Sequence, residues 1–112
     1  MGVYRLYTGG DGQSHIEELD PVSNPGLTTP KAVASIVFRE WPAGHFIDWH
    51  PAPRRQWVIT LSGRIEIGLG DGSVGSYGPG DARLVEDTTG QGHTTRVVGS
   101  RSSIMAVIPL AG

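Results

Sequence analysis

Glycine and proline interrupt this chain at short intervals, and this spacing limits what it can fold into. The 112 residues include 17 Gly and 8 Pro, and most of them fall in short turn signals spread along the chain. These signals are Gly9–Gly12, Asn24–Gly26, Pro42–Gly44, Ser62–Gly63, Gly70–Gly72, Gly78–Asp81, Gly90–Gly92 and Gly99–Ser100. No segment between them supports a long helix, so we expect many short strands.

The segments between the turns are strand-sized and rich in Val, Ile, Thr and aromatic residues. We predict strands over Val33–Arg39, Phe46–His50, Gln56–Leu61, Arg64–Leu69, Ala82–Glu86, Thr94–Val98 and Ser103–Ile108. An early edge strand is expected over Ile16–Leu19, and a loop over Pro21–Pro30. Ser62-Gly63 leaves room only for a two-residue turn, so the strands on either side of it are antiparallel. The pattern predicts an all-β sandwich or barrel.

Length, composition and charge restrict the class of protein further. A chain of this length with 38% hydrophobic and 18% charged residues is expected to form one domain with one core. It has no Cys, which excludes disulfides and thiolate metal ligands. The net charge is -2 and Arg54-Arg55 is the only adjacent basic pair, so we expect no nucleic-acid partner. No apolar stretch has signal-peptide or membrane-span length, which predicts a cytoplasmic protein without membrane contact.

The stretch from Gly44 to Gly63 contains glycine, histidine and glutamine residues at spacings typical of a known motif. Five residues separate Gly44 from His50, and six separate Gln56 from Gly63. This framework resembles the first motif of the cupin superfamily, which places a second His where Ala52 stands and a Glu where Gln56 stands. The resemblance implies an antiparallel jelly-roll β-barrel. It would form one domain over residues 1–112, with an N-terminal arm over 1–30 and a barrel core over about 31–109.

The second cupin motif is matched less closely. Gly80-Asp81 opens a similar strand, with Glu86 and Thr88 at the family's Pro and Gly positions, and His93 comes two residues late. The strand, the Gly-containing turn and His93 resemble the paired strands that carry the last metal ligand of a cupin to the mouth of the barrel.

Alternation along the strands groups the candidate ligands. If His50 points inward, so does Ala52 when the strand continues, and His93 shares a face with Thr95. Two imidazoles and an amide oxygen are possible ligands for divalent iron, manganese, nickel, zinc or copper. We therefore predict a metal site formed by His50, Gln56 and His93.

Relative to the family, this set lacks one imidazole and the only carboxylate. Glu86 or Asp87 could supply the missing charge. Because Glu86 shares a face with Ala82 and Leu84, its carboxyl could also act as an acid or base. Arg54 is a candidate to bind a substrate anion at the mouth of the barrel, and Thr95 is a candidate to line the pocket.

Two functional hypotheses follow. The first is an enzyme in which the metal polarises a carbonyl or activates oxygen or water, with His50, His93 and Glu86 as catalytic residues. The second is a metal-free pocket for a small, anionic molecule, either in a sensor or in an acid–base isomerase with His50 or His93 as the base.

A homodimer is also expected. A small sandwich leaves strand edges open, and a second copy can cover them. Trp41, Trp49 and Trp57 lie at the ends of predicted strands and are candidates for this interface.

Overall fold

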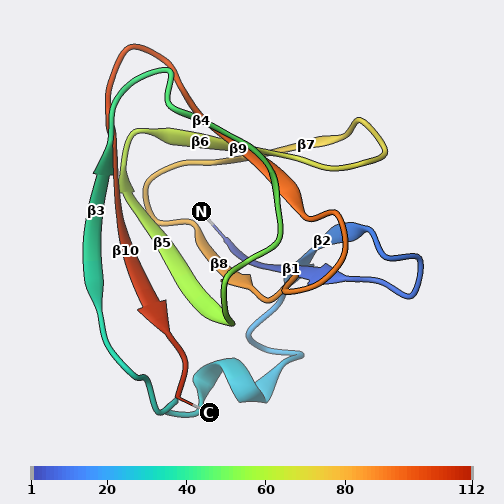
Figure 1. The fold of residues 1–112 in the computed structure, drawn as a ribbon. Coiled ribbons are helices and arrows are strands. Elements are labelled where there is room, and N and C mark those ends of the chain that lie inside the picture. Colours follow the sequence, from blue (N-terminus) through green and yellow to red (C-terminus); the bar gives the residue numbers. More distant parts are fainter. Residues whose placement is uncertain (1, 112) are drawn as a thin grey trace.

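The structure is a computed structural model that describes residues 2–111, and strands make up almost all of its regular structure (Figure 1). The strands are β1 (Val3–Thr8), β2 (Ser14–Leu19), β3 (Val37–Trp41), β4 (Phe46–His50), β5 (Gln56–Ser62), β6 (Arg64–Gly68), β7 (Val74–Tyr77), β8 (Ala82–Val85), β9 (His93–Val98) and β10 (Ser103–Pro109). One short 3₁₀ helix, η1 (Pro25–Thr28), lies in the described chain between β2 and β3. The prediction of an all-β fold is confirmed.

The strands form two sheets. The larger sheet has six strands in the order β2-β1-β8-β5-β10-β3, and the smaller has four in the order β4-β9-β6-β7. All the pairs within them are antiparallel except β1 with β8. Figure 1 shows the two sheets as the two walls of a jelly roll. The predicted jelly roll is confirmed, as two separately hydrogen-bonded sheets. The predicted antiparallel pairing across Ser62-Gly63 is wrong, because this turn leads from β5 in the larger sheet to β6 in the smaller one.

Most strands lie close to their predicted positions, but β3 is displaced. It begins at Val37 and ends at Trp41, whereas the sequence predicted a strand over Val33–Arg39. Pairing with β10 sets this register, because Ser103 lies opposite Trp41. Val33 forms only an isolated bridge with Leu110.

The N-terminal region contributes a hairpin to the larger sheet. β2 is the expected edge strand, and the sequence analysis did not predict β1. β1 pairs in parallel with β8, with Leu6 opposite Val85, and both side chains are buried in the core. Part of the expected arm over 1–30 therefore lies inside the sheet. The single-domain assignment remains a prediction.

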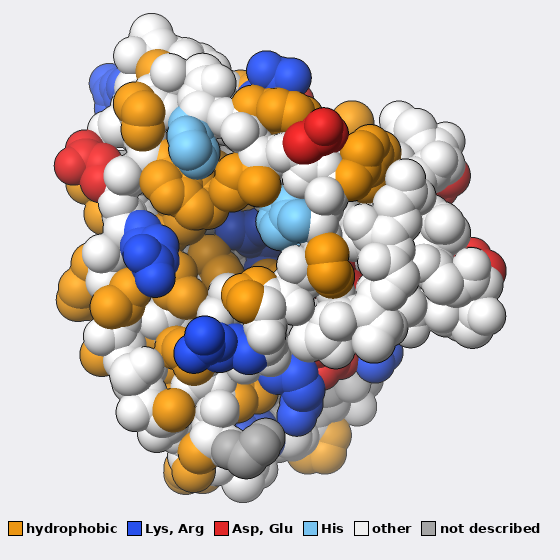
Figure 2. All heavy atoms as spheres, viewed as in Figure 1, with side chains coloured by type: hydrophobic (Ala, Val, Ile, Leu, Met, Phe, Trp, Pro, Cys, Tyr) orange, Lys and Arg blue, Asp and Glu red, His pale blue; other side chains and the backbone are white. Residues whose placement is uncertain are grey.

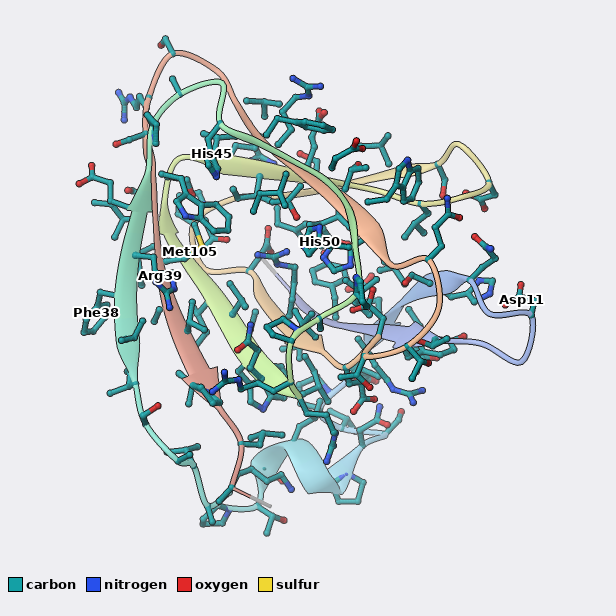
Figure 3. All side chains as sticks on the ribbon, in the orientation of Figure 1. Asp11, Phe38, Arg39, His45, His50 and Met105 are labelled. Carbon is teal, nitrogen blue, oxygen red and sulfur yellow. The ribbon has the colours of Figure 1, made fainter. Side chains whose placement is uncertain are left out.

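The core lies between the facing surfaces of the two sheets. Its apolar members include Leu6, Val58, Ile65, Ile67, Tyr77, Val85, Val97, Met105 and Val107. Figure 3 shows Met105 directed into the space between the sheets, whereas Phe38 on β3 points away from it. Within residues 2–111, no helix is long and apolar enough to cross a membrane.

Candidate small-molecule site

A cavity of about 390 Å³ lies between the two sheets. Figure 2 shows this hollow, with basic side chains around and within it. Its size is at the lower end of the ~300–1,000 Å³ typical of ligand pockets. Most of its lining is apolar, and its polar lining residues are Ser35, Arg39, His50, Arg54, Gln56, Arg83, His93 and Thr95. The sequence-predicted residues His50, Gln56, His93, Arg54 and Thr95 therefore meet at one cavity.

His50 and His93 lie opposite each other where β4 ends and β9 begins. Their ring centroids are 4.5 Å apart and the ring planes are inclined by 56°. Figure 3 shows His50 between the sheets. Gly92 permits this approach, because a Cβ atom there would lie 1.9 Å from the carbonyl oxygen of His50. Its φ of +79° also favours glycine.

A buried hydrogen-bond chain holds the ring of His93. The Nδ1 atom of His93 lies 2.6 Å from Oδ2 of Asp87, and the hydroxyl of Ser14 donates to the same oxygen at 2.6 Å. Asp87 is fully buried and His93 is 4% exposed. A carboxylate accepts but does not donate, so Nδ1 carries a proton, and in the neutral ring Nε2 has a free lone pair.

His50 is held in the same tautomer by different means. Its Nδ1 atom donates to the backbone carbonyl oxygen of Asp48 at 2.7 Å. Because a carbonyl oxygen can only accept, the Nε2 atom of His50 is also unprotonated when the ring is neutral. The cavity therefore has two imidazoles whose Nε2 atoms can each accept a proton.

Glu86 is the predicted site residue that does not line this cavity. Its carboxylate accepts hydrogen bonds from Nε of Arg5 and, at 2.9 Å, from Nε of Arg55. Burial raises the pKa of this carboxyl, but the two guanidinium groups outweigh that effect and hold the pKa below its ordinary value. Glu86 is therefore an ion-pair residue on the face of β8 that carries Leu84. The adjacent Asp87, weighed above only as a source of charge, contacts His93.

Arg83 is a cavity residue that the sequence analysis missed. It lies on the inward face of β8 opposite Val58 and is 5% exposed. Its guanidinium carbon is 5.3 Å from the centre of the Tyr77 ring. Burial is the largest influence on this group and lowers the pKa of Arg83 to about 10. The alternation of Arg83, Val85 and Asp87 on one face of the strand was the available signal.

The residues around the cavity do not fit a tightly held transition-metal ion. In the part of the chain that the structure describes, no group of three His, Cys, Asp or Glu side chains is arranged to hold one. Gln56 offers only a neutral amide, and Ala52 offers no ligand. The described lining includes Arg39, Arg54 and Arg83 but no carboxylate, so a divalent cation would meet a positive potential. This lining favours an anion.

Comparisons with known proteins concern the fold alone. No protein-family model and no curated protein matches the chain. Among solved structures, it resembles the conserved protein SPY1581 of unknown function from Streptococcus pyogenes, with a TM-score of 0.52 and 18% identity. That match covers 69% of this chain and 63% of the other, so the chain spans less than two thirds of the streptococcal protein.

Two further structures resemble the chain. Protein NMB1881 from Neisseria meningitidis matches with a TM-score of 0.50 and 11% identity, over 85% of this chain and 100% of that one. The dTDP-4-dehydrorhamnose 3,5-epimerase from Bacillus anthracis, solved with TDP and pyrophosphate bound, matches with a TM-score of 0.47 and 14% identity, over 97% and 70%. The strand order of the chain is that of an all-β jelly roll.

Proposed function

We propose that this protein is a cupin that binds a small organic molecule between its sheets and moves a proton with His93, without a metal ion. The observation that carries this proposal is the 2.6 Å contact between Nδ1 of His93 and the buried carboxylate of Asp87. It supports His93 as a general base, because a carboxylate-oriented neutral imidazole can take a proton by itself. The described lining of the cavity favours the acid–base isomerase over the metal-dependent enzyme, because it includes three arginines and no carboxylate.

The proposed chemistry is the removal and return of a proton on a carbon next to a carbonyl group. His93 Nε2 takes the proton, and the C–H electron pair moves into an enolate. The imidazolium formed is stabilised by Asp87, which accepts a hydrogen bond from Nδ1. Return of the proton to another face or carbon completes an isomerisation. His50 lines the same cavity. It is the candidate for the residue that returns a proton to the other face or carbon of the enolate.

Ser14 and Asp87 act as positioning residues in this scheme. The hydroxyl of Ser14 donates to the oxygen that accepts from His93, so it fixes the carboxylate while the ring changes charge. Oδ1 of Asp87 has no hydrogen-bond partner among the residues that the structure describes. The orientation of the carboxylate therefore depends on the two contacts made by Oδ2.

Solvent deuterium exchange tests the proposal. The protein is incubated in D₂O with a panel of small ketones, 2-oxo acids and 2-hydroxy acids, and loss of the proton signal next to the carbonyl or hydroxyl is followed by NMR. We expect catalysed exchange with at least one compound, and a loss of about 100-fold or more in His93→Gln. The control is His15→Gln, which alters an exposed histidine bonded to Asp11. Exchange that survives in His93→Gln, or that stops with a chelator and returns with metal, would overturn the proposal.

Nitrogen NMR provides a second test that needs no substrate. Neutral His93 in the wild-type protein is expected to show the Nδ1-protonated tautomer, and Asp87→Ala is expected to give a mixture of tautomers. The matched control is Asp11→Ala, which should leave the His93 signals unchanged. A wild-type His93 protonated at Nε2 instead would contradict the proposed general base.

A further inference from the structure

We propose that the ligand of this cavity is a small organic acid with an apolar body, and that Arg83 binds its carboxylate. This inference deepens the proposed function, because it names the class of molecule that would be held beside His93. The inference rests on two observations. The guanidinium of Arg83 lies against the ring of Tyr77, and its Nε atom is buried without a hydrogen-bond acceptor.

Arg83 is a buried cation without a hydrogen-bond acceptor. Its side chain lines the cavity and is 5% exposed, and its Nε atom is buried without a partner. Among residues 2–111, no carboxylate, carbonyl or hydroxyl accepts a hydrogen bond from its guanidinium group. A guanidinium has five N–H donors, and leaving buried donors unpaired is unfavourable. The arrangement is therefore completed by an acceptor that enters the cavity.

The nearby charged group does not fill this place. Asp81 lies close enough to favour the charged form of Arg83. Its carboxylate, however, accepts hydrogen bonds from the backbone N–H groups of Gly2 at 2.7 Å and Gly78 at 2.8 Å. The ring of Tyr77 covers part of the guanidinium but offers it only a π-face. The N–H fork of Arg83 is left for a ligand.

The chemistry of the cavity selects a carboxylate. The guanidinium fork matches the two oxygens of a planar carboxylate, and one buried positive charge balances one negative charge. Much of the remaining lining is apolar, including Ile47, Val58, Met105 and Val107. A monoanion with a hydrocarbon body satisfies both parts of this surface, whereas a phosphate dianion would retain an unbalanced charge at Arg83.

The two other arginines of the lining lie where an acid would enter. Arg39 and Arg54 are exposed residues that border the same cavity. Together they give the opening a positive potential, which attracts anions from solution. They are screened by water and salt, so we assign the anchoring contact to the buried Arg83 alone.

Matched acid and amide pairs test the inference. Binding of isovalerate and isovaleramide, and of benzoate and benzamide, is measured by calorimetry on the full chain. We expect at least one acid to bind about tenfold to a hundredfold more tightly than its amide, as loss of a charge-assisted hydrogen bond implies. Arg83→Met should remove this preference, and Arg83→Lys should keep part of it. The control is Arg101→Met, an exposed arginine outside this cavity, which should bind like the wild type.

Thermal unfolding separates a ligand-binding arginine from a structural one. Without ligand, Arg83→Met is expected to unfold at a higher temperature than the wild type, because it removes a buried guanidinium that has no hydrogen-bond acceptor. Acid binding that is unchanged in Arg83→Met, or equal binding of acids and amides by the wild type, would overturn the inference. If Arg83→Met does not fold, the wild-type comparison and Arg83→Lys still decide. Acid binding that depends on Arg83, with no deuterium exchange on any compound, would uphold this inference and contradict the proposed function.

Discussion

The imidazole ring of His50 lies 4.5 Å from that of His93, centroid to centroid, across the paired strands β4 and β9. The backbone between the two rings is closely packed, because the Cα atom of Gly92 lies against the carbonyl group of His50. The distance between the two proposed proton carriers therefore depends on a residue without a side chain.

Gly92→Ala is expected to destabilise the fold and to separate the two histidines. The new methyl group would clash with backbone atoms and would occupy a positive-φ conformation. We expect a loss of about 2 kcal/mol or more in the free energy of unfolding, measured by urea denaturation. Gly10→Ala is the control, because a Cβ atom there meets nothing within 4 Å. Equal stability of the two variants would contradict this account of the site.

Restoring the ligand set of the cupin motif is expected to raise the affinity of the chain for a divalent metal ion. Ala52→His together with Gln56→Glu supplies the imidazole and the carboxylate that the sequence motif omits. We expect the double variant to bind Ni²⁺ or Zn²⁺ at least about tenfold more tightly than the wild type, measured by calorimetry. Near-stoichiometric metal in wild-type protein purified without a His tag, found by elemental analysis, would instead support the metal-dependent hypothesis.

The Glu86 ion pairs predict a defined dependence of stability on pH. The carboxyl pKa is lower in the folded protein than its ordinary value of 4.5. Its contribution is therefore complete above that value and is lost as the pH falls through the lower folded-state pKa. We expect Glu86→Gln to be less stable by about 0.5–1 kcal/mol at neutral pH, with the difference shrinking at about pH 3.

Urea denaturation at both pH values measures this effect. Glu17→Gln is the matched control, because Glu17 also bonds Arg5, at 3.2 Å, but is more exposed. A difference between wild type and Glu86→Gln that grows on acidification would contradict the assignment.

We expect the protein to self-associate through β3, which lies at one edge of the larger sheet. β3 pairs with β10 on one side only, and its outward-facing Phe38 is 66% exposed. An apolar edge strand is a surface for a second copy of the chain. We expect wild-type protein to sediment as a dimer and Phe38→Glu as a monomer. Val74→Glu, on β7 at the edge of the smaller sheet, is the control. A wild type that is monomeric at all concentrations would contradict the prediction.

Local sequence signals predicted the positions of most strands well and their pairing less well. The strand Phe46–His50 follows from the β-propensity of its residues. Ser62-Gly63 does not close the expected hairpin, because it joins β5 and β6, which lie in different sheets. The position of β3 does not follow from local signals, because it is set by the distant partner β10. β1 was missed although it forms a local hairpin with β2 across the Gly9–Gly12 turn, and its second partner, β8, lies far away in the sequence.

The candidate site was predicted where a motif marked it and missed where alternation was ambiguous. On β8, Ala82 and Leu84 form the apolar face, and Arg83 and Asp81 carry charge. A rule that places charges outside would turn Arg83 toward solvent. In the structure Arg83 points inward, because Leu84 faces outward beside Trp57 on β5. At a functional cavity a charged residue can face inward, so the ordinary rule of apolar residues inside and charged residues outside fails there.

The hydroxyl of Ser14 reaches Asp87 from the beginning of the chain, and this has a consequence for folding order. His93 and Asp87 are near neighbours in sequence and can meet early, whereas the Ser14 contact spans 73 positions. Such long-range contacts form slowly, since the intervening chain must first be ordered. The hydrogen bond from Ser14 is therefore expected to form after Asp87 and His93 have met. A partly folded chain would hold Asp87 beside His93 without the hydrogen bond from Ser14 that fixes the carboxylate.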